Sequence, residues 1–128
     1  MNLRSLSRNE KIAILKSLLT VAGADGHLSS SESSYLGIFL MKMGEDQSFL
    51  NTLNMVPNSE VIRILNNFSY SDKQDLLYLW VEIAIKSHGN MIGVFRIKEL
   101  TDAKDTILTL AKLCNIEVDI NKEYAFYF

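Results

Sequence analysis

Apolar residues at helical spacing, framed by two capping boxes, constrain this chain more than any other feature. Ser7 and Glu10 form a Ser-x-x-Glu box, after which apolar residues recur every three or four positions as far as Ala22. This spacing predicts an amphipathic helix whose first turn is capped by Ser7. The helix is expected to end within 23–26, and a second box at Ser29–Glu32 is expected to open the next one. The segment therefore predicts two helices joined by a tight turn.

The same period continues through most of the 128 residues. Only one proline and six glycines interrupt a chain that is 48% apolar, a composition that can fill one core and is typical of helices. We predict an all-α fold, a single compact domain of six to seven helices. Residues 93–97 are an exception, because their alternating β-branched residues favour an extended segment. The later helices are expected at about 29–43, 46–54, 57–68, 71–88 with Ser71 as its cap, and 101–115.

An internal repeat emerges when Gly26 is placed over Gly89. The apolar positions before the two glycines then match without a gap, at a period of 63 residues (89 − 26). After the glycines the match requires about eight extra residues in the second copy, near 91–98. This pattern predicts two pseudo-repeated helix-turn-helix halves. Their expected limits are about 7–68 and 69–116, with an aromatic tail at 117–128.

The first turn carries the residues on which a family resemblance rests. They are Ala24, Asp25, Gly26, Leu28, Glu32, Leu36, Phe39 and Leu40. Together they resemble the signature of the TerB-like family, the small all-helical domains of tellurite-resistance protein B and of a membrane-anchored DnaJ-like co-chaperone. The resemblance implies a non-enzymatic interaction module of a bacterial stress-response (tellurite-resistance-like) or envelope-associated system. The second half departs from the family pattern, since His88 and Ala103 stand where acidic residues are expected.

Asp25 and Glu32 also have the spacing of the second half of an EF-hand calcium loop. Val21 and Gly23 stand where that loop requires carboxylates, so the full set of calcium ligands is missing. A structural role is one interpretation. In it Asp25 accepts hydrogen bonds from turn amides, and Glu32 closes the capping box with Ser29.

A divalent-metal site is the alternative. The two histidines of the chain lie one in each inter-helix turn. If the halves pack about a pseudo-twofold axis, Asp25, Glu32 and His88 would converge on an ion such as zinc, with Glu99 or Asp102 as a further ligand. No other cofactor is expected.

Charge and apolar content argue against several classes of partner. The net charge is −2, with both signs spread along the chain, so no nucleic-acid partner is expected. No stretch approaches the roughly 18 uncharged apolar residues that span a bilayer, so no direct membrane insertion is expected. Glu10 and Lys16 interrupt the only segment that imitates a secretion signal. A cytoplasmic protein is predicted.

Catalytic signatures are missing from the sequence. It contains no Gly-x-Ser-x-Gly elbow, Walker loop, His-Glu-x-x-His motif or Cys-x-x-Cys pair, and the chain is predicted not to be an enzyme. Cys114 lies on an apolar helical stripe and is expected to be a core residue. Phe68, Tyr78 and Trp80 are expected in the core or at its edge.

The tail is rich in aromatic residues, which are Tyr124, Phe126, Tyr127 and Phe128. In water they would form an apolar patch that favours association. The tail is expected to fold back over the helices; the alternative is that it binds a partner. A protein partner and a homodimer are both compatible with this pattern.

Overall fold

The structure, a computed structural model, describes residues 1–23, 30–88 and 94–118, and within these ranges it contains helices and no strands. The prediction of an all-α fold is confirmed. The described elements number seven, five α-helices and two 3-10 segments. They are η1 (Leu3–Ser5), α1 (Arg8–Ala22), α2 (Ser30–Lys42), η2 (Gln47–Met55), α3 (Asn58–Asn66), α4 (Tyr70–His88) and α5 (Val94–Leu113).

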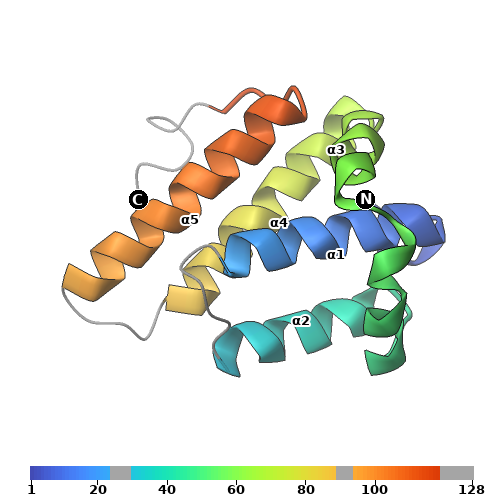
Figure 1. The fold of residues 1–128 in the computed structure, drawn as a ribbon, viewed down its shortest axis with the longest axis horizontal. Coiled ribbons are helices and arrows are strands. Elements are labelled where there is room, and N and C mark those ends of the chain that lie inside the picture. Colours follow the sequence, from blue (N-terminus) through green and yellow to red (C-terminus); the bar gives the residue numbers. More distant parts are fainter. Residues whose placement is uncertain (24–29, 89–93, 119–128) are drawn as a thin grey trace.

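Helix α1 lies at the centre of the molecule (Figure 1). It packs against α3, α4, α5 and η2, while α2 packs against α4 and η2. Trp80 and Cys114 are fully buried, as predicted for core residues, and Phe68 is partly buried against the core. Tyr78 is 62% exposed, so its placement in the core was wrong. Its equivalent in α1, Leu15, is buried because η2 and α3 also cover α1.

The predicted helix ends are confirmed at two places and corrected at a third. Ser7 accepts a hydrogen bond from the Glu10 amide (3.2 Å) and donates its own amide to the Glu10 carboxylate (2.9 Å), which is the predicted capping box. Gly44 ends α2 with a φ of +75°. The cap of α4 is Ser69 rather than Ser71, since the Ser69 hydroxyl accepts from the Asp72 amide at 3.1 Å.

Helix α5 begins at Val94, seven residues before the predicted start at 101 (101 − 94). The extended segment expected at 93–97 was therefore wrong for 94–97. A short apolar run with β-branched residues fits a helical period as well as an alternating one, and the length of the continuous helix decides between them. Here the run joins a helix of 20 residues.

The two helix pairs are arranged with approximate twofold symmetry. α2 packs on α4, and α5 packs on α1. At the crossing of α1 and α4, the Trp80 indole N–H donates to the Ser17 hydroxyl (2.9 Å), and these residues are 63 positions apart. A residue near a twofold axis contacts its own equivalent, so this contact marks the axis.

The ends of α2 and α5 correspond at a larger offset. Gly44 and Asn115 both have positive φ, and the following amide in each case donates to the carbonyl five residues back, Leu40 or Ala111. The offset here is 71 residues (115 − 44). Since α2 has 13 residues and α5 has 20, the extra residues of the second half lengthen α5 by about two turns. That the halves are copies of one segment stays a prediction.

Candidate functional site

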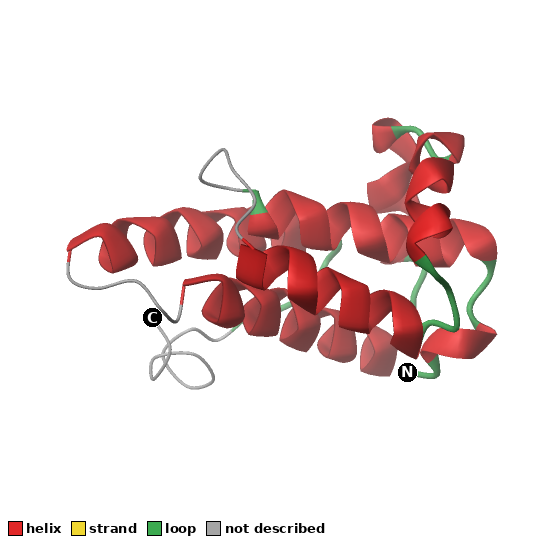
Figure 2. Cartoon of the chain, turned by 90° about the horizontal axis from the view of Figure 1, so that it is seen from below, coloured by secondary structure: helices red, strands yellow, loops and turns green. Residues whose placement is uncertain are grey.

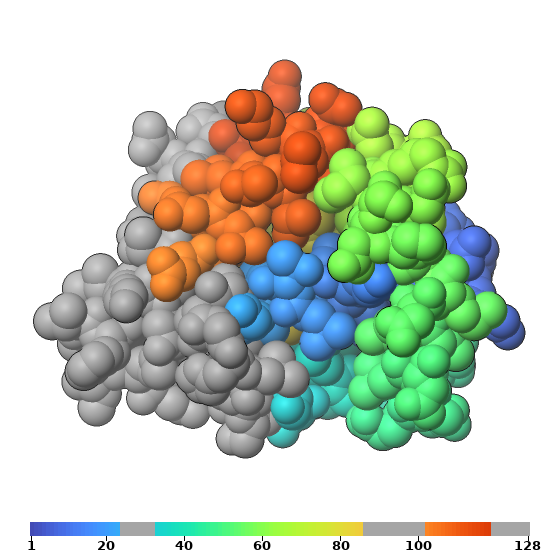
Figure 3. All heavy atoms as spheres, viewed as in Figure 1, coloured from blue at the N-terminus to red at the C-terminus, as the bar shows by residue number. Residues whose placement is uncertain are grey.

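A groove between α1, α3 and α5 is the candidate functional site. Figure 3 shows α1 in blue at its floor, between α5 in orange and α3 in green. The groove consists of two adjoining hollows, of about 280 and 260 Å³, that share Thr20 and Leu110. The lining residues are Lys16, Ser17, Thr20, Asn58, Val61, Ile62, Asp105, Thr106, Thr109, Leu110 and Leu113.

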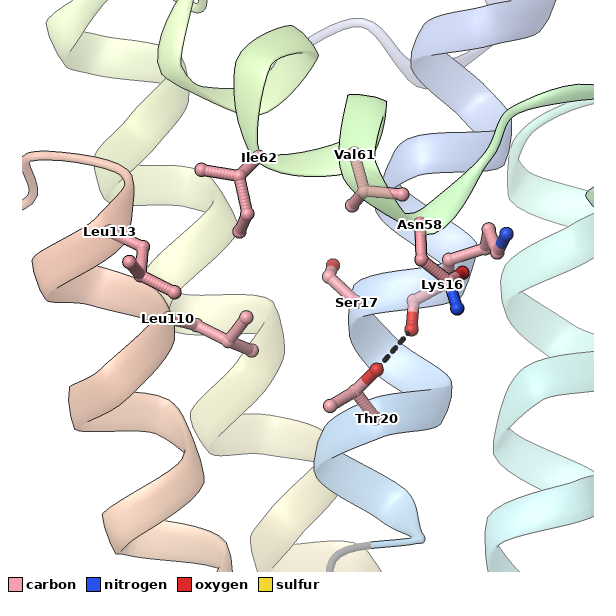
Figure 4. A pocket seen from close by; sticks show the side chains of 8 residues that line it. All are labelled: Lys16, Ser17, Thr20, Asn58, Val61, Ile62, Leu110 and Leu113. Carbon is pink, nitrogen blue, oxygen red and sulfur yellow. Dashed lines mark hydrogen bonds between the residues drawn. The ribbon is translucent and has the colours of Figure 1, made fainter.

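The wall of the groove near α3 is apolar. Val61 and Ile62 point into it from α3, and Leu110 and Leu113 point into it from α5 (Figure 4). Leu113 is 53% exposed, which is a large fraction for a leucine beside a core. This wall can bury apolar side chains of a ligand, a gain of roughly 25 cal/mol for each Å² removed from water.

The hydroxyl groups of the groove are hydrogen-bonded within their own helices. Ser17 donates to the Ile14 carbonyl (2.7 Å) and accepts from Trp80. Thr20 donates to the Lys16 carbonyl at 2.8 Å, as the dashed line in Figure 4 shows. Thr106 and Thr109 likewise donate to carbonyls four residues back, at 3.0 and 2.9 Å. None of these hydroxyls donates to a base, so none is activated as a nucleophile.

The two ends of the groove carry opposite charges. At the α3 end the Lys16 ammonium donates to the Val56 carbonyl at 2.7 Å. At the other end Asp105 is exposed to solvent. The groove therefore has a polarity along its length, with walls that offer apolar contact and hydroxyl oxygens that can accept hydrogen bonds.

The predicted metal ligands are placed only in part. Asp25 lies outside the described residues, as do the side chains of Glu32, His88 and Glu99. The backbone puts residue 32 in the first turn of α2 and residue 88 at the end of α4. The C-terminal ends of α1 and α4 and the N-terminal end of α2 lie at one end of the molecule (Figures 1 and 2).

No group of three or more histidine, cysteine, aspartate or glutamate side chains suited to a metal ion occurs in the described part of the chain. Asp102, the further candidate ligand, is half-buried on α5, where its carbonyl accepts the Thr106 hydroxyl. The metal site therefore stays a prediction. The tail residues Tyr124, Phe126, Tyr127 and Phe128 also lie outside the described residues.

Cys114 is confirmed as a core residue. Burial raises the pKa of its thiol, and the nearby Lys73 only partly offsets this effect. A thiol with a raised pKa is a poor nucleophile at neutral pH.

Sequence reasoning missed the groove. Its residues come from three helices, and the missed signal was a run of small hydroxyl residues on inner positions of α1 and α5. Thr20 and Thr106 follow the helical period of the buried residues but cannot fill the volume of a leucine or a tyrosine.

Comparison with protein-family models, with curated proteins and with solved structures gives no significant match. The resemblance to the TerB-like family therefore rests on the sequence motif alone. No helix in the described ranges is both long enough and apolar enough to cross a membrane.

Proposed function

We propose that this protein is a non-enzymatic helical interaction module that binds an amphipathic helix of a partner protein in the groove between α1, α3 and α5. The single observation that supports this most is the apolar wall of Val61, Ile62, Leu110 and Leu113, open to solvent beside a buried core. A helix binds such a groove by inserting a stripe of apolar side chains at i, i+3, i+4 and i+7.

The charges of the groove suggest the direction of the bound helix. A helix carries partial positive charge at its N-terminus and partial negative charge at its C-terminus. The favourable orientation places its N-terminus near Asp105 and its C-terminus near Lys16, which is the cationic end.

The cellular system is proposed on the resemblance of the first turn. A TerB-like module would act in a bacterial stress-response or envelope-associated system, as a scaffold rather than as a catalyst. The satisfied hydroxyls of the groove and the buried Cys114 support a binding role over a catalytic one.

The test uses a display library of helical peptides of 16 residues, selected against the intact protein. We expect selected peptides to carry one apolar stripe and to lose at least tenfold in affinity for a Thr20→Ile/Thr106→Tyr variant, which fills the groove. A Tyr70→Ser variant is the matched control, because Tyr70 is 77% exposed and does not line the groove. Peptides that bind the filled variant as tightly as the wild type would contradict the proposal.

Divalent-metal binding is kept as a second candidate because the helix ends beside the two turns lie together in Figures 1 and 2. Native mass spectrometry with added zinc tests it. A bound ion that is lost in Asp25→Asn and in His88→Ala, but retained in the control Asp105→Asn, is the expected result for this candidate. Equal zinc uptake by all four proteins would rule out the predicted ligands.

A further inference from the structure

The outer face of α2 carries exposed apolar side chains. Ile38 is 55% exposed and Met41 is 70% exposed. With Ser34 and Gly37 they form a stripe at i, i+3, i+4 and i+7 beside a hollow of about 500 Å³ that extends to Gln47. Seen from below, α2 lies in front of the other helices (Figure 2), so nothing described covers this face.

The equivalent face of α5 shows that the fold does not require apolar residues here. At the offset of 71 residues, Ile38 corresponds to Thr109 and Met41 corresponds to Lys112. Both residues of α5 are exposed, and both are polar. Solvent-facing positions in this architecture thus accept polar side chains, and the apolar pair on α2 calls for a covering surface.

The stripe is complementary to itself when two copies of α2 run antiparallel. With a twofold axis midway between positions 37 and 38, residues whose numbers add to 75 face each other. Met41 of one copy then faces Ser34 of the other, and Ile38 faces Gly37. Each large side chain meets a small one, which lets two helices approach closely as knobs into holes.

Charge also favours the antiparallel direction. Asp46 follows α2 directly, and two hydrogen bonds from Ser48 hold the pKa of the Asp46 carboxyl below its usual range, so it stays ionised at neutral pH. In the antiparallel pair this carboxylate lies near the positive N-terminal end of the partner's α2. In a parallel pair the two Asp46 carboxylates would lie side by side and repel each other. Glu45 is already paired with Lys11 at 3.0 Å.

We infer that two copies of this chain associate through the outer faces of α2, antiparallel and about a twofold axis. A helix of 13 residues is about 20 Å long, and its face is smaller than the roughly 800 Å² per partner of a standard interface. The dimer is therefore weak and dissociates on dilution. Because α2 does not line the groove, this inference stands apart from the proposed function.

Sedimentation equilibrium over a range of protein concentrations tests the association. The wild-type mass is expected to rise with concentration from 14.5 kDa toward twice that value. Ile38→Glu and Met41→Glu should stay monomeric throughout, while Leu113→Glu, a charge placed on an exposed leucine outside α2, should behave as the wild type. Since all three positions are solvent-exposed, circular dichroism should show unchanged folding. A wild type that stays monomeric, or a dimer unaffected by Ile38→Glu, would overturn the inference.

Disulfide cross-linking under mild oxidation tests the direction. Ile38→Cys alone should cross-link efficiently, because the two copies of position 38 lie near the axis. A mixture of Ser34→Cys and Met41→Cys should form a heterodimer more readily than either variant forms a homodimer, since the two copies of position 34 are about 10 Å apart along the helices. The wild type is the control, because Cys114 is buried. Preferred 34–34 and 41–41 links would overturn the antiparallel arrangement.

Discussion

The contact between α2 and α4 and the contact between α1 and α5 are equivalent by the approximate symmetry, but only one of them is filled. Tyr35, Phe39 and Ile83 fill the first and are 7%, 1% and 0% exposed. Their equivalents in the second, at offsets of 71 and 63 residues, are Thr106, Leu110 and Thr20. Thr106 is half-buried and Thr20 is exposed, and the hollows of the groove lie between them.

This difference shows how a groove arises without any change of backbone plan. Replacing a tyrosine and an isoleucine by two threonines removes side-chain volume from between the same pair of helices. The threonine hydroxyls then donate to carbonyls of their own helices, so opening the groove leaves no unsatisfied donor. The filled contact stabilises the fold, and the open contact is available to a ligand.

The strongest way to break this comparison is to open the filled contact. Tyr35→Thr should lower the free energy of unfolding by about 2–4 kcal/mol, because a buried ring is lost and the helices close the space only in part. Urea unfolding measures the effect. The matched change in the open contact, Thr106→Ser, should cost less than about 1 kcal/mol, and an equal cost at both positions would show that the contacts are not distinguished by packing.

Filling the open contact tests it in the other direction. The double variant Thr20→Ile/Thr106→Tyr should raise the free energy of unfolding by about 1 kcal/mol, because new apolar surface is buried without removing a needed hydrogen bond. Thermal and urea unfolding measure the gain, with Thr109→Val as a single-site control that leaves most of the groove open. A loss of stability would mean that the helices cannot accommodate the larger side chains.

The smallest expected effect is at high pH. Burial and then the Glu82 carboxylate, which is hydrogen-bonded with the Tyr35 hydroxyl, raise the pKa of Tyr35. Because an unfolded tyrosine has a pKa of about 10, this contribution to stability is complete below pH 10 and is lost as the pH rises above it. Tyr35→Phe should therefore cost about 1 kcal/mol at pH 7 and decline less steeply above pH 10. Parallel pH profiles of the two proteins would refute this.

Much of the fold could be predicted because its signals are local. The Ser7 box, the positive φ at Gly44 and the apolar periods of α1, α2 and α4 depend on residues within one or two turns. The start of α5 was mispredicted because a run at 94–97 fits two periods, and only the whole helix resolves the ambiguity. The cap of α4 was mispredicted by two residues for a related reason, since Ser69 and Ser71 both precede the same apolar stripe.

The groove could not be predicted because it depends on how three helices cross. Thr20 and Thr106 are 86 positions apart (106 − 20), and neither residue is unusual in its own helix. The exposure of Tyr78 escaped prediction for the same reason. Its period assigns it to the inner face of α4, yet whether that face is covered depends on the path of η2 and α3.

The hydrogen bond between Ser17 and Trp80 has a consequence for the order in which the molecule is built. Helix α1 is made early, but its partners α4 and α5 follow only after Trp80 and the residues beyond it have been synthesised. At about 5–20 residues per second, the 63 positions between the two residues take roughly 3–12 s to translate. During that time the apolar stripe of α1 has only η2 and α3 to pack against. Nascent chains halted before residue 80 should therefore be the species most prone to aggregate and most in need of a chaperone.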